Sequence, residues 1–412
     1  MVQRIQLANG VRLVVEPMEH IHSVAIGIWV HTGSRTEQPS ENGISHFVEH
    51  LMFKGTESMS AAHIAAAFDR IGGHVNAFTS KEYTCFYAKV MSRHAKEAAR
   101  ILSDMFFHSS FKDEEIERER QVILEEIRMV EDTADDVVHD DLDRAAFGAT
   151  PLGLPILGSE QSIQSFDRNQ LRQFVKDQYR PERVVVSVAG NMDSSLLDQI
   201  CDDFSQFEES DAKQDAPIQQ EMGFEHLVRK KPVEQAHLCL GLPGVSLTDE
   251  RLYAMVIYNH LLGGGMSSRL FQEIREQRAL AYSVYSYHTS YQDTGMLTIY
   301  AGTATERLEE TYATTMRMIE ELAKSHSITE EDLESAKAHV IGSTLLGLES
   351  SSSRMNRNGR NEVALQEHQT LEELSHRIER VHLPDVHEIA EHIHADRHAM
   401  ALISPDGKLP YN

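Results

Sequence analysis

Two histidines and a glutamate within one short segment are the first residues in the chain that could perform chemistry together. His46 and His50 are four residues apart, so on a helix their imidazoles lie one above the other on a single face. Two neutral imidazoles in this arrangement can hold one Zn²⁺ and leave coordination positions for a third ligand and for water. Glu49 lies about one turn from His46, so its carboxylate can reach a water molecule bound to the metal.

The order His-x-x-Glu-His is the inverse of His-Glu-x-x-His and occurs among zinc-protease signatures. Chance is the competing explanation, because the chain contains 23 histidines and an isolated pair at this spacing is more often a solvated helix face. The requirement for a glutamate directly before the second histidine removes most chance matches. The motif therefore favours a metal site, and another part of the chain must supply a third ligand.

A carboxylate is a common third protein ligand of a catalytic zinc ion. Residues 113–131 are typical of a strongly charged helix with an apolar stripe, formed by Ile116, Val122, Ile123 and Ile127. Glu119 and Glu126 are two turns apart and share a face that borders this stripe, whereas Glu114 and Glu125 are expected to point further towards solvent. Periodicity favours the Glu119/Glu126 pair but leaves open which of the two contacts the metal.

Strands and helices around these residues must position them. Alternating apolar residues predict strands at 11–16, 23–31 and 82–91, and an extended segment at 74–80. Ser60 can cap a helix that runs to about Ile71. Further helices are expected at 95–107, 113–131 and 168–178, and a buried strand is expected at 184–189.

The second half of the chain repeats this order of elements at an offset of about 210 residues, which indicates an internal duplication. Its expected elements are strands at 236–241, 281–287, 295–302 and 399–403, helices at 248–262, 306–324, 329–346 and 371–381, and a polar loop at 349–359. We expect an α+β fold with two homologous domains, each a mostly antiparallel sheet packed against helices. The expected boundaries are 1–204 for a zinc-binding catalytic domain, 205–222 for a polar linker and 223–412 for a homologous domain without metal.

The segment in register with the opening motif, residues 257–265, keeps His260 but has no counterpart of Glu49. It cannot form a second zinc site of the same kind, so one zinc ion per chain is expected. The second half is then expected to contribute through structure, substrate binding or assembly.

Composition and charge exclude several classes of protein. Acidic residues outnumber basic residues by 64 to 39, a net charge of −25, which argues against nucleic acid and anionic membrane surfaces as partners. The three cysteines have no Cys-x-x-Cys spacing, which fits a reducing compartment. The sequence shows neither a signal-peptide pattern nor an apolar run long enough for a membrane span, so a cytoplasmic location is expected.

Two segments resemble the pitrilysin/insulysin/mitochondrial processing peptidase family. The first is His46-Phe47-Val48-Glu49-His50 followed by Phe53-Lys54-Gly55-Thr56, and the second is ERERQVILEE at 117–126. The resemblance extends over essentially the whole chain and is greatest for the two-domain, processing-peptidase-like bacterial branch. It implies that Glu126 is the third zinc ligand and that Glu119 supports the site without binding the metal.

The resemblance also implies how a substrate is held. Asn76, Ala77, Phe78 and Thr79 resemble the family's sheet edge, to which a peptide adds as an extra strand through its backbone. An ordinary strand after a Gly-Gly turn would explain this segment equally well. Arg275 and Tyr282 resemble the family's Arg/Tyr pair that holds the substrate backbone opposite the zinc. Without the resemblance, Arg275 would be explained as a solvated helix residue and Tyr282 as an aromatic residue of a strand.

These expectations combine into a zinc endopeptidase of the inverzincin type that hydrolyses peptides or unfolded polypeptide segments. His46, His50 and Glu126 would bind the metal, Glu49 would act as general base, and Glu119, Arg275 and Tyr282 would assist. Family members of this size act as pairs, so a homodimer that encloses a chamber is expected, each site completed by the partner subunit. The alternatives are a catalytically inactive assembly subunit of the same fold and a metal-dependent hydrolase that acts on something other than peptides.

Overall fold

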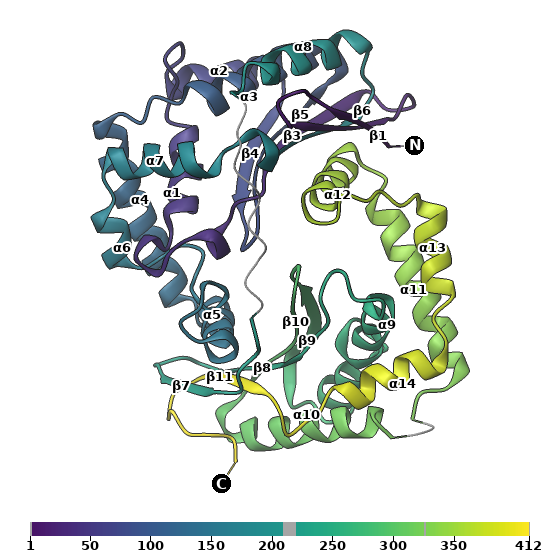
Figure 1. Ribbon diagram of the computed structural model, residues 1–412. Coiled ribbons are helices and arrows are strands. Elements are labelled where there is room, and N and C mark those ends of the chain that lie inside the picture. The colour runs from purple at the N-terminus through teal and green to yellow at the C-terminus, as the bar shows by residue number, and fades with distance from the viewer. Residues whose placement is uncertain (1, 209–219, 325–326, 412) are drawn as a thin grey trace. The chain divides into compact units, whose positions relative to one another are not determined.

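The computed structural model describes residues 2–208, 220–324 and 327–411. These residues form two compact units, each a sheet packed with helices, which confirms the predicted α+β class (Figure 1). Unit 1 consists of Met1–Ile127, Pro155–Ala216 and Leu346–Thr370. Unit 2 consists of Arg128–Leu154, Pro217–Leu345 and Leu371–Asn412.

Unit 1 contains a six-stranded sheet in the order β1-β2-β6-β3-β5-β4. Its strands are β1 (Gln3–Gln6), β2 (Arg12–Pro17), β3 (Ser23–Val30), β4 (His74–Thr79), β5 (Thr84–Met91) and β6 (Val184–Gly190). Neighbouring strands are antiparallel, except that β2 and β6 run parallel. The strands predicted from sequence alternation are all present, and β4 forms one edge of the sheet.

Helices cover both faces of this sheet. They are α1 (Ile44–Met52), α2 (Ala61–Arg70), α3 (Ala95–His108), α4 (Asp113–Asp132), α6 (Glu160–Ser165), α7 (Arg168–Gln178), α8 (Ser194–Ser205) and α12 (Ser351–Ala364). On β3, Ile26 and Ile28 belong to the core that includes α1, α3 and α7, whereas Ala25 and Trp29 face α12. Since both faces are buried, the strand is continuously apolar, as its sequence indicated. The Ser60 oxygen accepts the backbone N–H of His63, so the predicted cap of α2 is confirmed.

The expectation of a polar loop at 349–359 is wrong, because helix α12 occupies this segment. Its buried face contains few apolar residues, so its sequence lacks the periodicity that indicates a core helix. Gly359 makes the packing possible, since a Cβ at this position would lie 2.2 Å from Nε1 of Trp29. The indole therefore packs directly against the backbone of α12, and its Nε1 lies 3.4 Å from the sulfur of Met355.

Unit 2 has the same strand arrangement as the last five strands of unit 1. Its sheet runs β7-β11-β8-β10-β9, with β7 and β11 parallel and the other neighbours antiparallel. The strands are β7 (His226–Lys230), β8 (Ala236–Pro243), β9 (Ala281–Ser290), β10 (Gly295–Thr303) and β11 (Ala399–Ser404). One core joins the sheet to α9 (Leu252–Gly263), α10 (Leu308–Leu322), α11 (Glu330–Gly347), α13 (Leu371–Glu379) and α14 (Leu383–His392), and a second joins its other face to α5 (Ala134–Phe147).

The compact units differ from the boundaries expected from the sequence, 1–204 and 223–412. Helix α5 belongs to the first half of the chain but packs in unit 2, and α12 belongs to the second half but packs in unit 1. Each sheet has a second apolar face that must be covered, and a helix from the other half of the sequence covers it. Residues 209–219 of the expected linker lie outside the described residues.

In the described part of the chain, every helix falls short of the length or apolar character that crossing a membrane requires.

Candidate metal centre

Helix α1 is fixed in unit 1 by its apolar face and by an unusual cap. Phe47, Val48 and Leu51 are fully buried in the core, which turns His46, Glu49 and His50 to the other face. Gly43 precedes the helix with a φ of 95°, and a Cβ there would lie 2.8 Å from the Cα of Gly158. Glycine is therefore required at this position.

The buried carboxylate of Glu37 replaces the missing side-chain cap of α1. Its oxygens accept the backbone N–H groups of Gly43 at 2.8 Å and Ser45 at 2.9 Å, and the amide of Asn42 at 3.2 Å. Burial raises the pKa of Glu37 to about 7, although these hydrogen bonds oppose the shift. The sequence analysis missed this residue, because a capping carboxylate that approaches from outside the helix leaves no local spacing signal.

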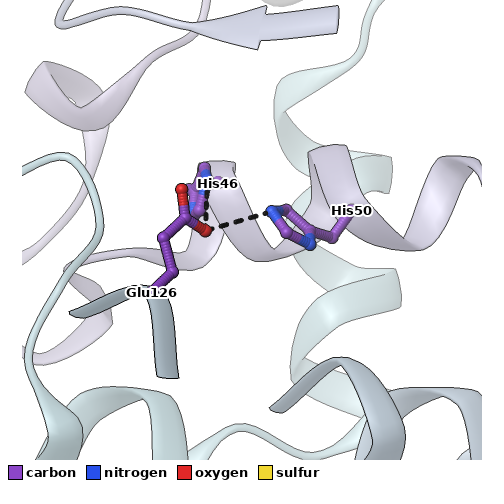
Figure 2. A group of neighbouring side chains, drawn as sticks. All are labelled: His46, His50 and Glu126. Atoms are coloured by element: carbon purple, nitrogen blue, oxygen red, sulfur yellow. Dashed lines mark ion pairs between the residues drawn. The ribbon is translucent and has the colours of Figure 1, made fainter. Parts of the chain in front are cut away.

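His46, His50 and Glu126 converge (Figure 2). Oε2 of Glu126 lies 3.8 Å from Nε2 of His46 and 3.6 Å from Nε2 of His50. One candidate ligand atom from each residue lies within 4.8 Å of the other two. Two imidazole nitrogens and one carboxylate oxygen are a donor set typical of catalytic zinc sites, so these residues fit the metal that the sequence predicts.

His46 is in a state suited to binding a cation. Burial, together with the neighbouring His50, lowers the pKa of His46 to about 3, so its imidazole is neutral at ordinary pH. His46 is 7% exposed, and among the described residues its Nδ1 has no hydrogen-bond partner. A neutral imidazole in a desolvated position keeps the lone pair of Nε2 free for a metal ion.

Glu119 lies on the buried face of α4 and contacts the opposite side of His50. Its Oε2 is 3.1 Å from Nδ1 of His50, and its Oε1 is 2.9 Å from Nζ of Lys54. Burial alone would raise the pKa of Glu119, but the hydrogen bonds with His50 and Lys54 outweigh it and hold the pKa below its ordinary value. The carboxylate therefore orients His50 so that Nε2 faces Glu126.

Glu49 lies beside these candidate ligands, and one of its carboxylate oxygens already accepts a hydrogen bond. The hydroxyl of Thr79 donates to Oε2 of Glu49 at 2.6 Å. Burial raises the pKa of Glu49, and the hydrogen bond from Thr79 offsets part of the shift. A partly desolvated carboxylate with a raised pKa accepts a proton more readily than an ordinary carboxylate does.

The predicted substrate-binding segment is the edge strand β4. Ala77 lies on the side of the core that holds α1, whereas Phe78 packs on the opposite side, 5.5 Å from Trp29 between ring centroids. The side-chain oxygen of Asn76 accepts the backbone N–H of Ala77 at 2.9 Å. The strand thus has backbone groups at a sheet edge, and its side chains pack alternately against the core on either face of the sheet.

Arg275 and Tyr282 lie together in unit 2. Arg275 belongs to a short π-helix, Phe271–Gln277, and Tyr282 lies at the start of β9. The guanidinium carbon is 4.6 Å from the ring centroid of Tyr282, which is a cation–π contact. Tyr282 is 77% exposed, so its ring and hydroxyl are accessible in unit 2.

One prediction for α4 is wrong. The sequence predicts Val122 in the apolar stripe, but this side chain is 48% exposed, whereas Ile116, Ile123 and Leu124 are buried. Val122 is about 120° around the helix from Ile116, so it cannot share that face. Glu119 fills the place on the buried face, and Glu114 and Glu125 are exposed as expected.

Two family models match consecutive parts of the chain. Residues 12–160 match the insulinase model, described as peptidase family M16, and residues 165–340 match the model described as the peptidase M16 inactive domain. The uncharacterized zinc protease YmxG of Bacillus subtilis is 49% identical over the full length of both chains. The chain belongs to peptidase family M16.

A second relative and two solved structures align with nearly the whole chain. An uncharacterized zinc protease of Streptomyces coelicolor is 39% identical and aligns with 98% of this chain and 90% of its own length. The crystal structure of a protease from Helicobacter pylori has a TM-score of 0.90 at 23% identity, covering 98% of this chain and 99% of the other. A chain of Complex III2 from Candida albicans has a TM-score of 0.84 at 19% identity, covering 98% and 96%. At these identities the two solved structures establish a shared fold.

Proposed function

We propose that the chain is a zinc-dependent endopeptidase that hydrolyses peptides or unfolded polypeptide segments. The observation that carries the proposal is the convergence of His46, His50 and Glu126 next to a carboxylate, Glu49, that does not belong to the ligand set. The names of the curated relatives, zinc proteases, support a zinc peptidase.

In this proposal each residue near the metal has one task. His46, His50 and Glu126 would hold one Zn²⁺, which when bound supplies Lewis acidity towards water and the scissile carbonyl. Glu49 takes a proton from the attacking water and delivers it to the leaving amine, so its carboxylate must stay free of the metal. Glu119 holds His50 at Nδ1, and Lys54 supports that carboxylate. The edge strand β4, through Asn76, Ala77, Phe78 and Thr79, receives the substrate backbone.

The decisive experiment combines metal analysis with cleavage of quenched fluorescent peptides by the purified chain. We expect about one zinc per chain, cleavage that a zinc chelator abolishes, and recovery when zinc is restored. Glu49→Gln should retain the zinc but lose turnover by about 10²- to 10⁴-fold. Glu114→Gln removes a charge from an exposed carboxylate and should behave like the unmodified chain.

Three outcomes would reject or redirect the proposal. Equal activity of Glu49→Gln would remove the general base from the mechanism. A chain that binds no zinc and leaves all peptides intact would indicate the alternative, an inactive assembly subunit of the same fold. Zinc without peptide cleavage, together with hydrolysis of a non-peptide ester or amide, would indicate a different hydrolase.

We further propose that the enzyme is a homodimer that encloses a chamber, in which Arg275 and Tyr282 of the partner subunit hold the substrate opposite the zinc. The cation–π contact between the two side chains supports their action as one group. Mixing inactive Glu49→Gln chains with inactive Arg275→Ala chains should restore about a quarter of the activity, since half the dimers are mixed and each has one complete site. A mixed dimer without activity would refute completion by the partner.

We also propose a cytoplasmic location, which the three unpaired cysteines support.

A further inference from the structure

Thr79 is the last residue of β4, and its main chain faces the open edge of the sheet. The adjacent Ser80 donates its backbone N–H to the carbonyl of Tyr83 at 2.8 Å, and the register pairs Thr79 with Thr84. In an antiparallel ladder, hydrogen-bonded and non-hydrogen-bonded pairs alternate. Thr79 and Thr84 are therefore a non-hydrogen-bonded pair, and the N–H and C=O of Thr79 point away from β5.

The side chain of the same residue points towards α1 and has a single proton to donate. Two acceptors lie near it, Oε2 of Glu49 at 2.6 Å and the hydroxyl oxygen of Thr84 at 3.5 Å. The hydroxyl of Thr84 donates its own proton to the carbonyl of Thr32 at 2.9 Å. The short contact to a carboxylate is the stronger of the two, so the Thr79 hydroxyl donates its hydrogen bond to Glu49.

This hydrogen bond restrains a side chain that would otherwise rotate. A glutamate has three rotatable torsions, and Glu49 lies on the helix face that carries the two histidines. With Oε2 held by Thr79, Oε1 is the oxygen left to exchange a proton with water or substrate. We propose that Thr79 is a positioning residue: its hydroxyl orients the general base Glu49, while its main chain lies on the edge that receives the substrate strand.

The inference deepens the proposed endopeptidase function and rests on it. Thr79 serves two requirements of the reaction, the orientation of the base and the placement of the substrate strand. Because the strand that receives the substrate also holds the base, β4 positions both the carboxylate of Glu49 and the added peptide strand. A misplacement of about 1 Å in such an arrangement can lower the rate by about 100-fold.

The test compares three variants under steady-state conditions with a peptide that the unmodified chain cleaves. Thr79→Val keeps the size and the β-branch but removes the hydroxyl, and we expect kcat to fall by about 10- to 100-fold with unchanged KM and zinc content. Thr79→Ser returns the hydroxyl and should recover most of the lost kcat. Thr84→Val removes a hydroxyl from the paired position, leaves the contact between Thr79 and Glu49, and should lower thermal stability more than kcat.

Several results would overturn the inference while the proposed function stands. With an unmodified chain that cleaves the peptide, the first such result is a Thr79→Val variant that has the kcat of the unmodified chain. The second is a Thr84→Val variant that loses as much kcat as Thr79→Val, and the third is a Thr79→Ser variant that is as slow as Thr79→Val. If Thr79→Val does not fold, Thr79→Ala compared with Thr79→Ser makes the same test. An unmodified chain that binds zinc but cleaves no peptide overturns the proposed function and this inference with it.

Discussion

Replacing Glu119 with glutamine removes the charge that orients His50, a proposed zinc ligand, and leaves the three proposed metal ligands in place. Glu119 is 4% exposed, and its two oxygens are divided between His50, at 3.1 Å, and Lys54, at 2.9 Å. Glutamine can still accept one hydrogen bond from Nδ1 of His50. However, a hydrogen bond to a neutral amide is about half as strong as one to a carboxylate. The imidazole is then less firmly oriented.

The expected loss is in zinc affinity. Removal of a partner that holds a metal-bound histidine typically costs about 10- to 100-fold in affinity, or about 1.4 to 2.7 kcal/mol. The contact with Lys54 adds little, since that side chain is 31% exposed and solvent screens the pair. The assay is competition for zinc with a chromogenic chelator of known affinity, and circular dichroism verifies the fold of each variant.

Glu114→Gln is the matched control, because it removes the same charge from an exposed position on the same helix. It should leave zinc affinity unchanged. The reasoning is refuted if Glu119→Gln binds zinc as tightly as Glu114→Gln. A loss of zinc together with a loss of helical signal would assign Glu119 to folding instead.

Two further predictions concern stability. Gly359→Ala should lower the free energy of unfolding by about 1 to 3 kcal/mol in chemical denaturation, because the new Cβ would lie 2.2 Å from Trp29. The control is Gly342→Ala in α11, where nothing lies within 4 Å of a Cβ, and it should be neutral or stabilising by up to about 1 kcal/mol. Equal effects of the two substitutions would refute the close packing of α12. His288 accepts the backbone N–H of Val245 at 3.1 Å, and burial lowers its pKa to about 4. The folded chain favours the neutral form of His288. The contribution of this histidine to the free energy of unfolding is therefore present above pH 6.5 and is lost as the pH falls towards 4. Between these values the unmodified chain should lose about 2 to 3 kcal/mol more than His288→Gln in pH-dependent unfolding, and parallel curves would contradict the assignment.

Local spacing in the sequence was sufficient to place three candidate groups together on α1. The positions of His46, Glu49 and His50 on one turn of helix follow from helical geometry, and the apolar residues between them determine which face is turned away from the core. The same reasoning predicted most strands of both sheets, since apolar periodicity reflects burial of one face or of both. The capping role of Ser60 depended on a contact with a residue only three positions away.

The tertiary structure decided everything that joins distant segments. Periodicity placed Glu119 and Glu126 on one side of α4 but could not distinguish them; packing of α4 beside α1 directs Glu119 to Nδ1 of His50 and Glu126 to Nε2 of both histidines. Likewise, the burial of the polar helix α12 against Trp29 has no signal in its own sequence, because the partner surface supplies the apolar side chains. A sequence determines which faces a segment can bury, whereas the identity of the neighbour that covers each face depends on the whole fold.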